Sequence, residues 1–314
     1  MTRSRRENIK PRRLVRSGLP VLLALGAGLM GAGCGAGSRP ARGATVAART
    51  ASFTVSAPRS RPRIAVHPRS SRPRVTVHPR SSRSTDATKP LAGETVVVDP
   101  GHNGHNYLYP SIINRLVPAG RGRVKPCNTT GTSTDGGYPE AAFNWDVALR
   151  LRALLLAQGA RVVLTRHSNT GVGPCVNVRA AIGNAARADA VIAIHADGGP
   201  PDGRGFQVIY APDLGATART YAASLRLARA VNHGLRASGV LPPSTYVGHD
   251  GYSVRDDLAG LNLSTRPAIF VELGNMRNST DAAIQISPQM RERLAKALDA
   301  GLKQFLVASV AHLR

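Results

Sequence analysis

Short runs of β-branched and aliphatic residues alternate with longer segments of mixed polarity from about residue 92 to the end of the chain. Runs of this length, bounded by Gly, Pro, Asp or Arg, are typical of buried strands. Because apolar residues follow one another without strict alternation, both faces of such strands are expected to be covered. The expected strands span residues 94–99, 161–165, 190–194, 206–210 and 268–272.

The segments between these runs carry apolar residues at helical spacing. Residues 140–158 show this pattern and are expected to form a helix. Gly159 follows it, and glycine is favoured just beyond a helix C-terminus. The alternation predicts one α/β domain over residues 92–314, with a central mixed, mostly parallel sheet flanked by helices on both faces. The other expected helices span residues 176–188, 217–238 and 288–312.

Three of the expected strands end in a titratable side chain. The run VVVDPGH ends at His102, VIAIH at His195 and IFVE at Glu272. Because ligands of open α/β sheets lie at the carboxyl ends of the strands, we expect these side chains to meet at one sheet edge. Glu140 begins an expected helix and would point its carboxylate into the same crevice. Two His and one Glu bound to zinc, with water in the fourth position and a second Glu to take its proton, form a hydrolytic site.

Each of these residues also has an ordinary structural interpretation. His102 would be a surface histidine beside a turn, His195 a core histidine bonded to backbone, and Glu140 an acid favoured by the helix dipole. Because all three and Glu272 are expected at the same edge of the sheet, a catalytic site is favoured over four separate structural roles. Asp99, just before the turn, would accept from the second ring nitrogen of His102 or hold the loop.

Positive charge is concentrated before the domain. The chain has a formal net charge of +24, and residues 1–90 hold 19 Lys and Arg against 2 Asp and Glu. Seven basic residues precede an uncharged apolar stretch at residues 18–33, shorter than the roughly 20 residues of a spanning helix. This pattern predicts an export leader over residues 1–34, by the general or the twin-arginine route. Cys34 is either an ordinary cysteine near the cleavage site or a lipidation site.

Residues 35–91 are rich in Ser, Arg and Pro and contain an eleven-residue repeat, SRPRIAVHPRS followed by SRPRVTVHPRS. Proline at this density disfavours helices and central strands, so we expect a disordered basic linker. Its charge suits an anionic membrane surface or cell-wall polymer. Nucleic acid is disfavoured as a partner, because the expected domain has few aromatic residues for stacking and the leader indicates export.

The cysteines are consistent with export to the periplasm, the cell wall or the medium. With Cys34 in the leader, Cys127 and Cys175 remain as a pair. A disulfide between them is the natural expectation in an oxidising compartment, and two free thiols are the alternative. The protein would be released, or anchored through its leader or Cys34.

The order of these motifs resembles the zinc-dependent N-acetylmuramoyl-L-alanine amidases of the Amidase_3 family. The resemblance covers roughly residues 94–310 and is closest to short, single-domain members of mycobacteria and related actinobacteria. One departure is the loop after His102, which reads NGHN where the family usually has glycines and an acid, so that His105 could compete for metal. The matching stretches are VVVDPGH, Pro139-Glu140, VVLTR, ADAVIAIHAD and VELGNMRN.

The resemblance implies hydrolysis of the amide between N-acetylmuramic acid and L-alanine in peptidoglycan, with one Zn²⁺ per catalytic domain. It assigns the zinc ligands to His102, Glu140 and His195 and the catalytic role to Glu272. Residues that would support the ligands or shape the substrate groove are Asp99, Asn144, Arg179, Asp197 and Asn262.

Two other functions stay open. A zinc peptidase that cleaves within the stem peptide would use the same metal chemistry, and only its substrate would distinguish it. A non-catalytic wall-binding homologue would be expected to lack one of the four central residues, all of which this sequence retains. Nothing in the periodicity predicts an oligomer interface.

Overall fold

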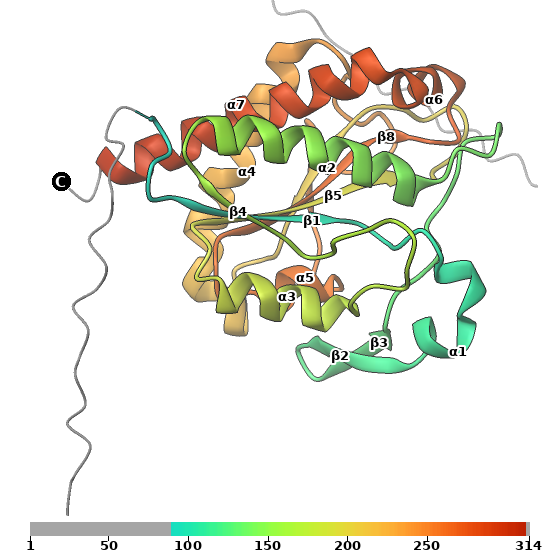
Figure 1. The fold of residues 1–314 in the computed structure, drawn as a ribbon, viewed down its shortest axis with the longest axis horizontal. Helices are drawn as coiled ribbons and strands as arrows, with labels where there is room; N and C mark the ends of the chain where they lie inside the picture. Colours follow the sequence, from blue (N-terminus) through green and yellow to red (C-terminus); the bar gives the residue numbers. More distant parts are fainter. Residues whose placement is uncertain (1–88, 312–314) are drawn as a thin grey trace, which may run out of the picture. The chain divides into compact units, whose positions relative to one another are not determined.

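A mixed six-stranded sheet forms the centre of the domain (Figure 1). The computed structural model describes residues 89–311, so the predicted leader, Cys34 and the repeat of the predicted linker lie outside the described residues. Pairing is parallel except between β6 and β8, which confirms the predicted mixed, mostly parallel sheet. The strand order is β4 (Arg161–Leu164), β1 (Thr95–Pro100), β5 (Ala190–Asp197), β8 (Ala268–Asn275), β6 (Gln207–Tyr210) and β7 (Tyr252–Val254).

Helices cover both faces of the sheet, as the alternating pattern predicts (Figure 1). Because successive strand residues point to opposite faces, Ile192 and Ile194 of β5 enter the main core, while Val191 lies in a smaller core on the other side. The main core is shared with α2 (Glu140–Ala157), α4 (Ala218–Ser238) and α7 (Pro288–Ala311). The opposite face is covered by α3 (Val176–Ala185) and α5 (Ala259–Asn262).

Several short elements were not predicted, because three to eight residues are too few to show a period. Between β1 and α2 lie η1 (Asn106–Leu108), α1 (Pro110–Ile113) and a hairpin of β2 (Leu116–Gly120) and β3 (Arg123–Pro126). The others are η2 (Gly215–Thr217), β7, α5 and α6 (Ser279–Ile286). The strands β5 and β8 each run three residues beyond the predicted end, because they pair with each other past His195 and Glu272.

The domain also begins earlier than predicted. Leu91, which the sequence assigns to the linker, is fully buried in the main core. Its backbone N–H donates to the carbonyl oxygen of Gln158 at the end of α2. A single apolar residue between Pro90 and Ala92 carries no periodic signal, so only the packing reveals its place.

A disulfide joins Cys127, directly after β3, to Cys175, directly before α3. Both cysteines are buried with Val117 in a small separate cluster. The disulfide predicted from the sequence is therefore present, and it attaches the hairpin to the rest of the domain. Within residues 89–311, no helix has both the length and the apolar character needed to cross a bilayer.

Candidate metal centre

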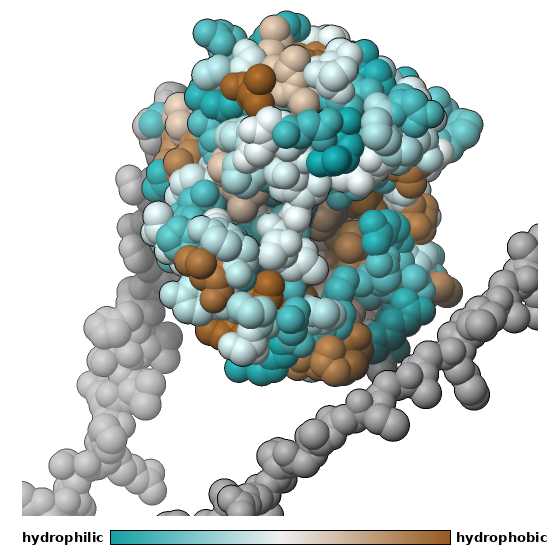
Figure 2. Space-filling model, turned by 90° about the vertical axis from the view of Figure 1, so that its right-hand side faces the viewer, coloured by the Kyte–Doolittle hydropathy of each residue, from teal (hydrophilic) through white to brown (hydrophobic). Residues whose placement is uncertain are grey.

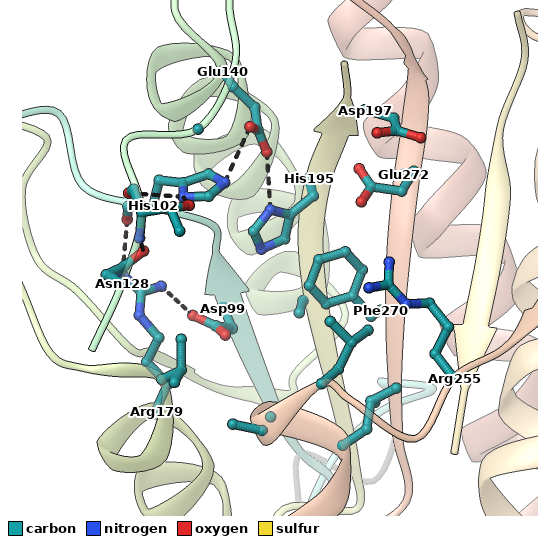
Figure 3. Close-up of a pocket in the computed structure, with 18 of the residues that line it drawn as sticks. Asp99, His102, Asn128, Glu140, Arg179, His195, Asp197, Arg255, Phe270 and Glu272 are labelled. Atoms are coloured by element: carbon teal, nitrogen blue, oxygen red, sulfur yellow. Dashed lines mark hydrogen bonds and ion pairs between the residues drawn. The ribbon is translucent and has the colours of Figure 1, made fainter. Parts of the chain in front are cut away.

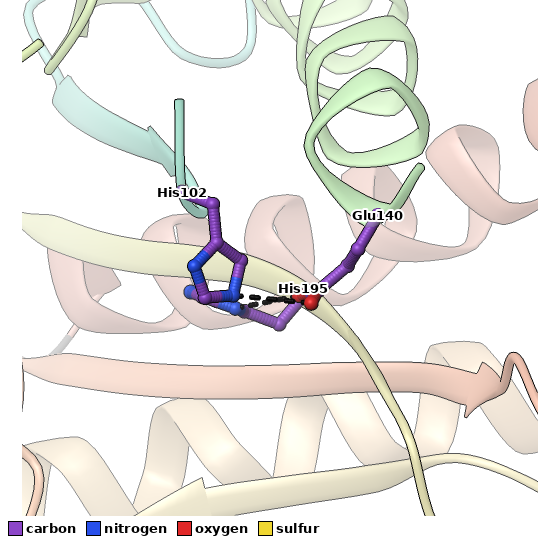
Figure 4. A group of neighbouring side chains, drawn as sticks. All are labelled: His102, Glu140 and His195. Atoms are coloured by element: carbon purple, nitrogen blue, oxygen red, sulfur yellow. Dashed lines mark hydrogen bonds and ion pairs between the residues drawn. The ribbon is translucent and has the colours of Figure 1, made fainter. Parts of the chain in front are cut away.

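Three side chains from separate elements converge at the carboxyl edge of the sheet (Figure 4). His102 follows β1, Glu140 is the first residue of α2, and His195 lies on β5. One potential ligand atom from each lies within 4.8 Å of the others. The carboxylate lies between the two rings, with Oε2 3.1 Å from His102 Nε2 and Oε1 2.9 Å from His195 Nδ1. Two imidazoles and one carboxylate are a donor set that suits a catalytic zinc ion.

The turn that carries His102 is held in an unusual conformation. His102 has a backbone φ of 54°, in the left-handed region that non-glycine residues seldom adopt. Arg179 fixes this turn, because its Nη2 donates to the carbonyl oxygen of His102 (2.7 Å) and its Nη1 to that of Pro100 (2.8 Å). Surrounding bonds of this kind are what keeps a strained residue in place at a functional site.

Asp99 does not contact the ring of His102, which corrects one of its two predicted roles. The carbonyl oxygen of Thr129 accepts from His102 Nδ1 instead, at 3.1 Å. Asp99 accepts from Thr165 and from Nη1 of Arg179. It therefore holds the loop, the other predicted role, and does so through Arg179.

Glu140 is buried and its carboxylate is fully engaged. The backbone N–H of Thr132 donates to Oε2 (3.0 Å), and that of Ala196 donates to Oε1 (3.2 Å). Asn144, one turn further along α2, also donates to Oε1 (3.1 Å), so this predicted residue supports the candidate ligand directly. Burial alone would raise the pKa of Glu140, but the rings of His102 and His195 hold it well below its usual value.

Gly131 is packed against two of the candidate ligands. An added Cβ would lie 2.8 Å from Glu140 Oε2 and 2.8 Å from Cδ2 of His102. We expect Gly131→Ala to weaken zinc binding by about 10- to 100-fold, the usual effect of disturbing groups that orient metal ligands. A zinc titration against a chromogenic chelator measures this.

Gly137→Ala is the matched control for that substitution. Gly131 and Gly137 have similar backbone φ values of 78° and 83°, but a Cβ at Gly137 meets no atom within 4 Å. Both variants therefore carry the left-handed backbone cost of about 1–2 kcal/mol, and only Gly131→Ala disturbs the ligands. Equal zinc affinity in the two variants would contradict the packing argument.

Glu272 lies on β8 directly opposite His195 of β5 and does not belong to the three-residue cluster. Its carboxylate points toward His195, with Asp197 above it (Figure 3). Glu272 is buried, and its Oε2 has no hydrogen-bond partner among the described residues. Burial, followed by the negative charges of Glu140 and Asp197, raises the pKa of Glu272 well above its usual value. A buried carboxyl group with one unpartnered oxygen and a raised pKa is suited to proton transfer.

A cavity of about 390 Å³ extends from these groups along the face of the sheet that α3 and α5 cover, and Figure 3 shows part of its lining. Phe270 forms one wall and stacks on His195, with ring centroids 4.0 Å apart. Arg255 also lines the cavity, next to Phe270 in Figure 3, and pairs with both carboxylate oxygens of Asp257. Phe270 could have been found from the sequence, because it lies two residues before Glu272 and so faces the same side of the strand. Arg255 lies in a loop without such a signal.

Asp197 and Asn262 lie in different places relative to this cavity. Asp197 lines it and accepts a hydrogen bond from the hydroxyl group of Tyr246 (2.8 Å), a residue that the sequence did not indicate. Asn262 is buried away from the cluster and donates to the carbonyl oxygen of Ala119, which attaches the β2–β3 hairpin to α5. The ring of His105 lies outside the cluster and contacts the ring of Tyr107.

Known proteins are similar to this chain in sequence and in fold. The sequence model of the Amidase_3 family, described as N-acetylmuramoyl-L-alanine amidase, matches residues 96–304. An N-acetylmuramoyl-L-alanine amidase of Mycobacterium tuberculosis is 48% identical over 217 residues, which are 69% of this chain and 88% of the relative.

Two solved structures are similar over the same part of the chain. The N-acetylmuramyl-L-alanine amidase Ami1 of Mycobacterium smegmatis matches with a TM-score of 0.66 and 46% identity, covering 69% of this chain and 99% of that one. The apo form of Ami1 from Mycobacterium abscessus matches with a TM-score of 0.65 and 46% identity, covering 69% and 100%.

Proposed function

Because the chain belongs to the Amidase_3 family and is an N-acetylmuramoyl-L-alanine amidase of peptidoglycan, we propose that its hydrolysis depends on one Zn²⁺ held by His102, Glu140 and His195. The observation that carries this proposal is the convergence of two imidazoles and one carboxylate within 4.8 Å, beside the separate carboxyl group of Glu272. A zinc ion bound there would polarise the scissile carbonyl group and lower the pKa of a water molecule.

Glu272 is the proton-transfer group in this proposal. It takes a proton from the water that attacks the lactyl carbonyl carbon, and returns it to the amide nitrogen as the C–N bond breaks. The products are the free lactyl carboxylate on the sugar and a stem peptide with a free L-alanine amino group. The unpartnered Oε2 of Glu272 and its raised pKa support this role.

The remaining predicted site residues have supporting roles in this proposal. Asn144 orients Glu140, and Asp99 acts through Arg179 to hold the turn of His102. Asp197 lines the groove beside Glu272. Asn262 acts further away, because its bond to Ala119 fixes the hairpin next to the cavity.

We further propose that the chain is exported and acts at the cell wall. Peptidoglycan as the substrate and the Cys127–Cys175 disulfide both support an exported protein. In this proposal residues 1–34 are the leader and the basic residues that follow form a linker that retains the enzyme on anionic wall or membrane surfaces. Its catalytic domain then begins slightly before residue 92, since Leu91 belongs to the core.

Mass spectrometry of muropeptides tests the proposed chemistry. Incubation with muramyl dipeptide and longer muropeptides should release peptides that begin with L-alanine, because the bond cleaved is the lactyl amide. A chelator should abolish this release, and added Zn²⁺ should restore it. Cleavage inside the stem would identify a peptidase, whereas bound zinc without any cleavage would indicate a wall-binding protein.

A further inference from the structure

The segment after His102 has an inverted pattern of burial. Asn103 and Asn106 are buried, while Tyr107, Leu108 and Tyr109 are 65%, 54% and 45% exposed. Asparagine is mostly exposed in proteins, and large apolar side chains gathered on a surface mark a contact site. The segment therefore exposes the side chains that would ordinarily form its core.

Hydrogen bonds fix this segment to the candidate metal centre. Asn103 donates to the side-chain oxygen of Asn106 (3.2 Å), and Asn106 donates to the carbonyl oxygen of Thr129 (2.6 Å). The same carbonyl oxygen of Thr129 lies next to Nδ1 of His102. The exposed tyrosines thus keep a defined position relative to the catalytic groups.

The β2–β3 hairpin continues this apolar surface. Leu116 lies opposite Pro126, and Pro118 opposite Val124, so that each pair shares one face of the hairpin. All four are exposed, Leu116 by 63% and Val124 by 61%. Brown areas interrupt the lower part of the face drawn in Figure 2, the end of the molecule where α1 and the hairpin lie in Figure 1. We call this surface the outer patch; it consists of Tyr107, Leu108, Tyr109, Ile112, Leu116, Pro118, Val124 and Pro126.

The outer patch is continuous with the catalytic cavity and free of negative charge. Pro126 belongs to the patch and also lines the cavity. Between Asp99 and Asp135 the chain has four Lys and Arg and no Asp or Glu. The segment itself therefore adds no negative charge that would repel a polymer with carboxylates on its peptide stems, and Asp256, which lies against the hairpin, is paired with Arg123.

We propose that the outer patch binds the glycan strand of peptidoglycan next to the muramoyl unit being processed, with Tyr107 and Tyr109 stacking on the apolar C–H faces of the sugar rings. This rests on the proposed function, because the patch is assigned to the glycan by its position beside the cavity that takes the muramoyl amide. Continuity with the cavity favours the substrate over a lipid surface or a second copy of the chain. The patch provides contacts that a substrate with one sugar cannot make.

Calorimetric titration of the full-length, zinc-loaded protein with peptide-free glycan strands of several disaccharides tests the proposal. We expect the double variant Tyr107→Ala/Tyr109→Ala to raise Kd by about tenfold, because two stacking surfaces are lost. The double variant Tyr107→Phe/Tyr109→Phe keeps the rings and should bind like the wild type. Ile286→Ala, which removes an apolar side chain of similar exposure (54%) at the C-terminal end of α6, is the matched control and should have no effect.

The same variants should show a split in activity. The double alanine variant should lose about tenfold in kcat/KM on intact glycan polymer and retain wild-type activity on muramyl dipeptide. An unchanged Kd for glycan strands would overturn the proposal, as would an equal loss on both substrates. Two other results would also overturn it, if the double alanine variant kept its glycan affinity. Loss of binding to anionic vesicles would assign the patch to a lipid surface, and loss of a dimer in sedimentation would assign it to a second copy of the chain.

Failure of the proposed zinc-dependent hydrolysis can be distinguished from failure of the glycan-binding proposal. If the wild type bound zinc but cleaved no muropeptide, the zinc-dependent mechanism would fail, whereas the titration with glycan strands would still decide the role of the patch.

Discussion

Replacement of Glu272 by glutamine is expected to lower kcat by roughly 10²- to 10⁴-fold, the range typical of removing a general acid–base group. The amide has the shape of the carboxyl group but cannot accept a proton from water or return it to the leaving amine. Zinc content should stay at one per chain, because Glu272 lies outside the cluster of His102, Glu140 and His195. Muropeptide turnover and elemental analysis of the purified variant measure the two properties.

The fold of this variant should be intact or more stable. Glu272 is buried near the carboxylates of Glu140 and Asp197, with one oxygen unpartnered, so glutamine removes an unfavourable negative charge. Thermal unfolding without metal should therefore give a Tm no lower than that of the wild type. Turnover close to the wild-type rate in a folded, zinc-loaded variant would remove Glu272 from the mechanism.

Glu140→Gln is expected to abolish stoichiometric zinc binding and, with it, activity. The carboxylate is the one negatively charged group among the three candidate ligands, and it lies within 3.1 Å of both imidazoles. The amide of glutamine has no negative charge to offer the metal. Its NH₂ group would also face one or more of the donors of Thr132, Asn144 and Ala196, which now donate to the two carboxylate oxygens, and two donors cannot bond to each other. We expect less than about one tenth of the wild-type zinc content after dialysis, in line with the loss of a direct ligand.

Asp197→Asn is the control for this substitution. Asp197 lines the same cavity and also carries a carboxylate, but it lies outside the cluster. Its variant should retain one zinc per chain. Equal zinc loss in both variants would mean that the overall negative charge of the cavity binds the metal, rather than the geometry of the three residues.

The sequence by itself identified the sheet and the residues at its edge. Runs such as that of β5 are apolar on both faces because helices cover both sides, and this is the property that predicts a parallel sheet. His102, His195 and Glu272 were found because each ends such a run, and strand ends lie at one edge whatever the loops do. Cys127 and Cys175 were paired because the other cysteine belongs to the expected leader.

Only the tertiary structure decided which groups support these residues. Thr129, rather than Asp99, accepts from His102, and Tyr246 donates to Asp197, because loops distant in sequence pass close to the sheet edge. The exposed tyrosines and the outer face of the hairpin are defined by burial and pairing within elements too short to show a period. A hydrophobic period reports which face of an element is covered, whereas these contacts depend on where separate segments meet in space.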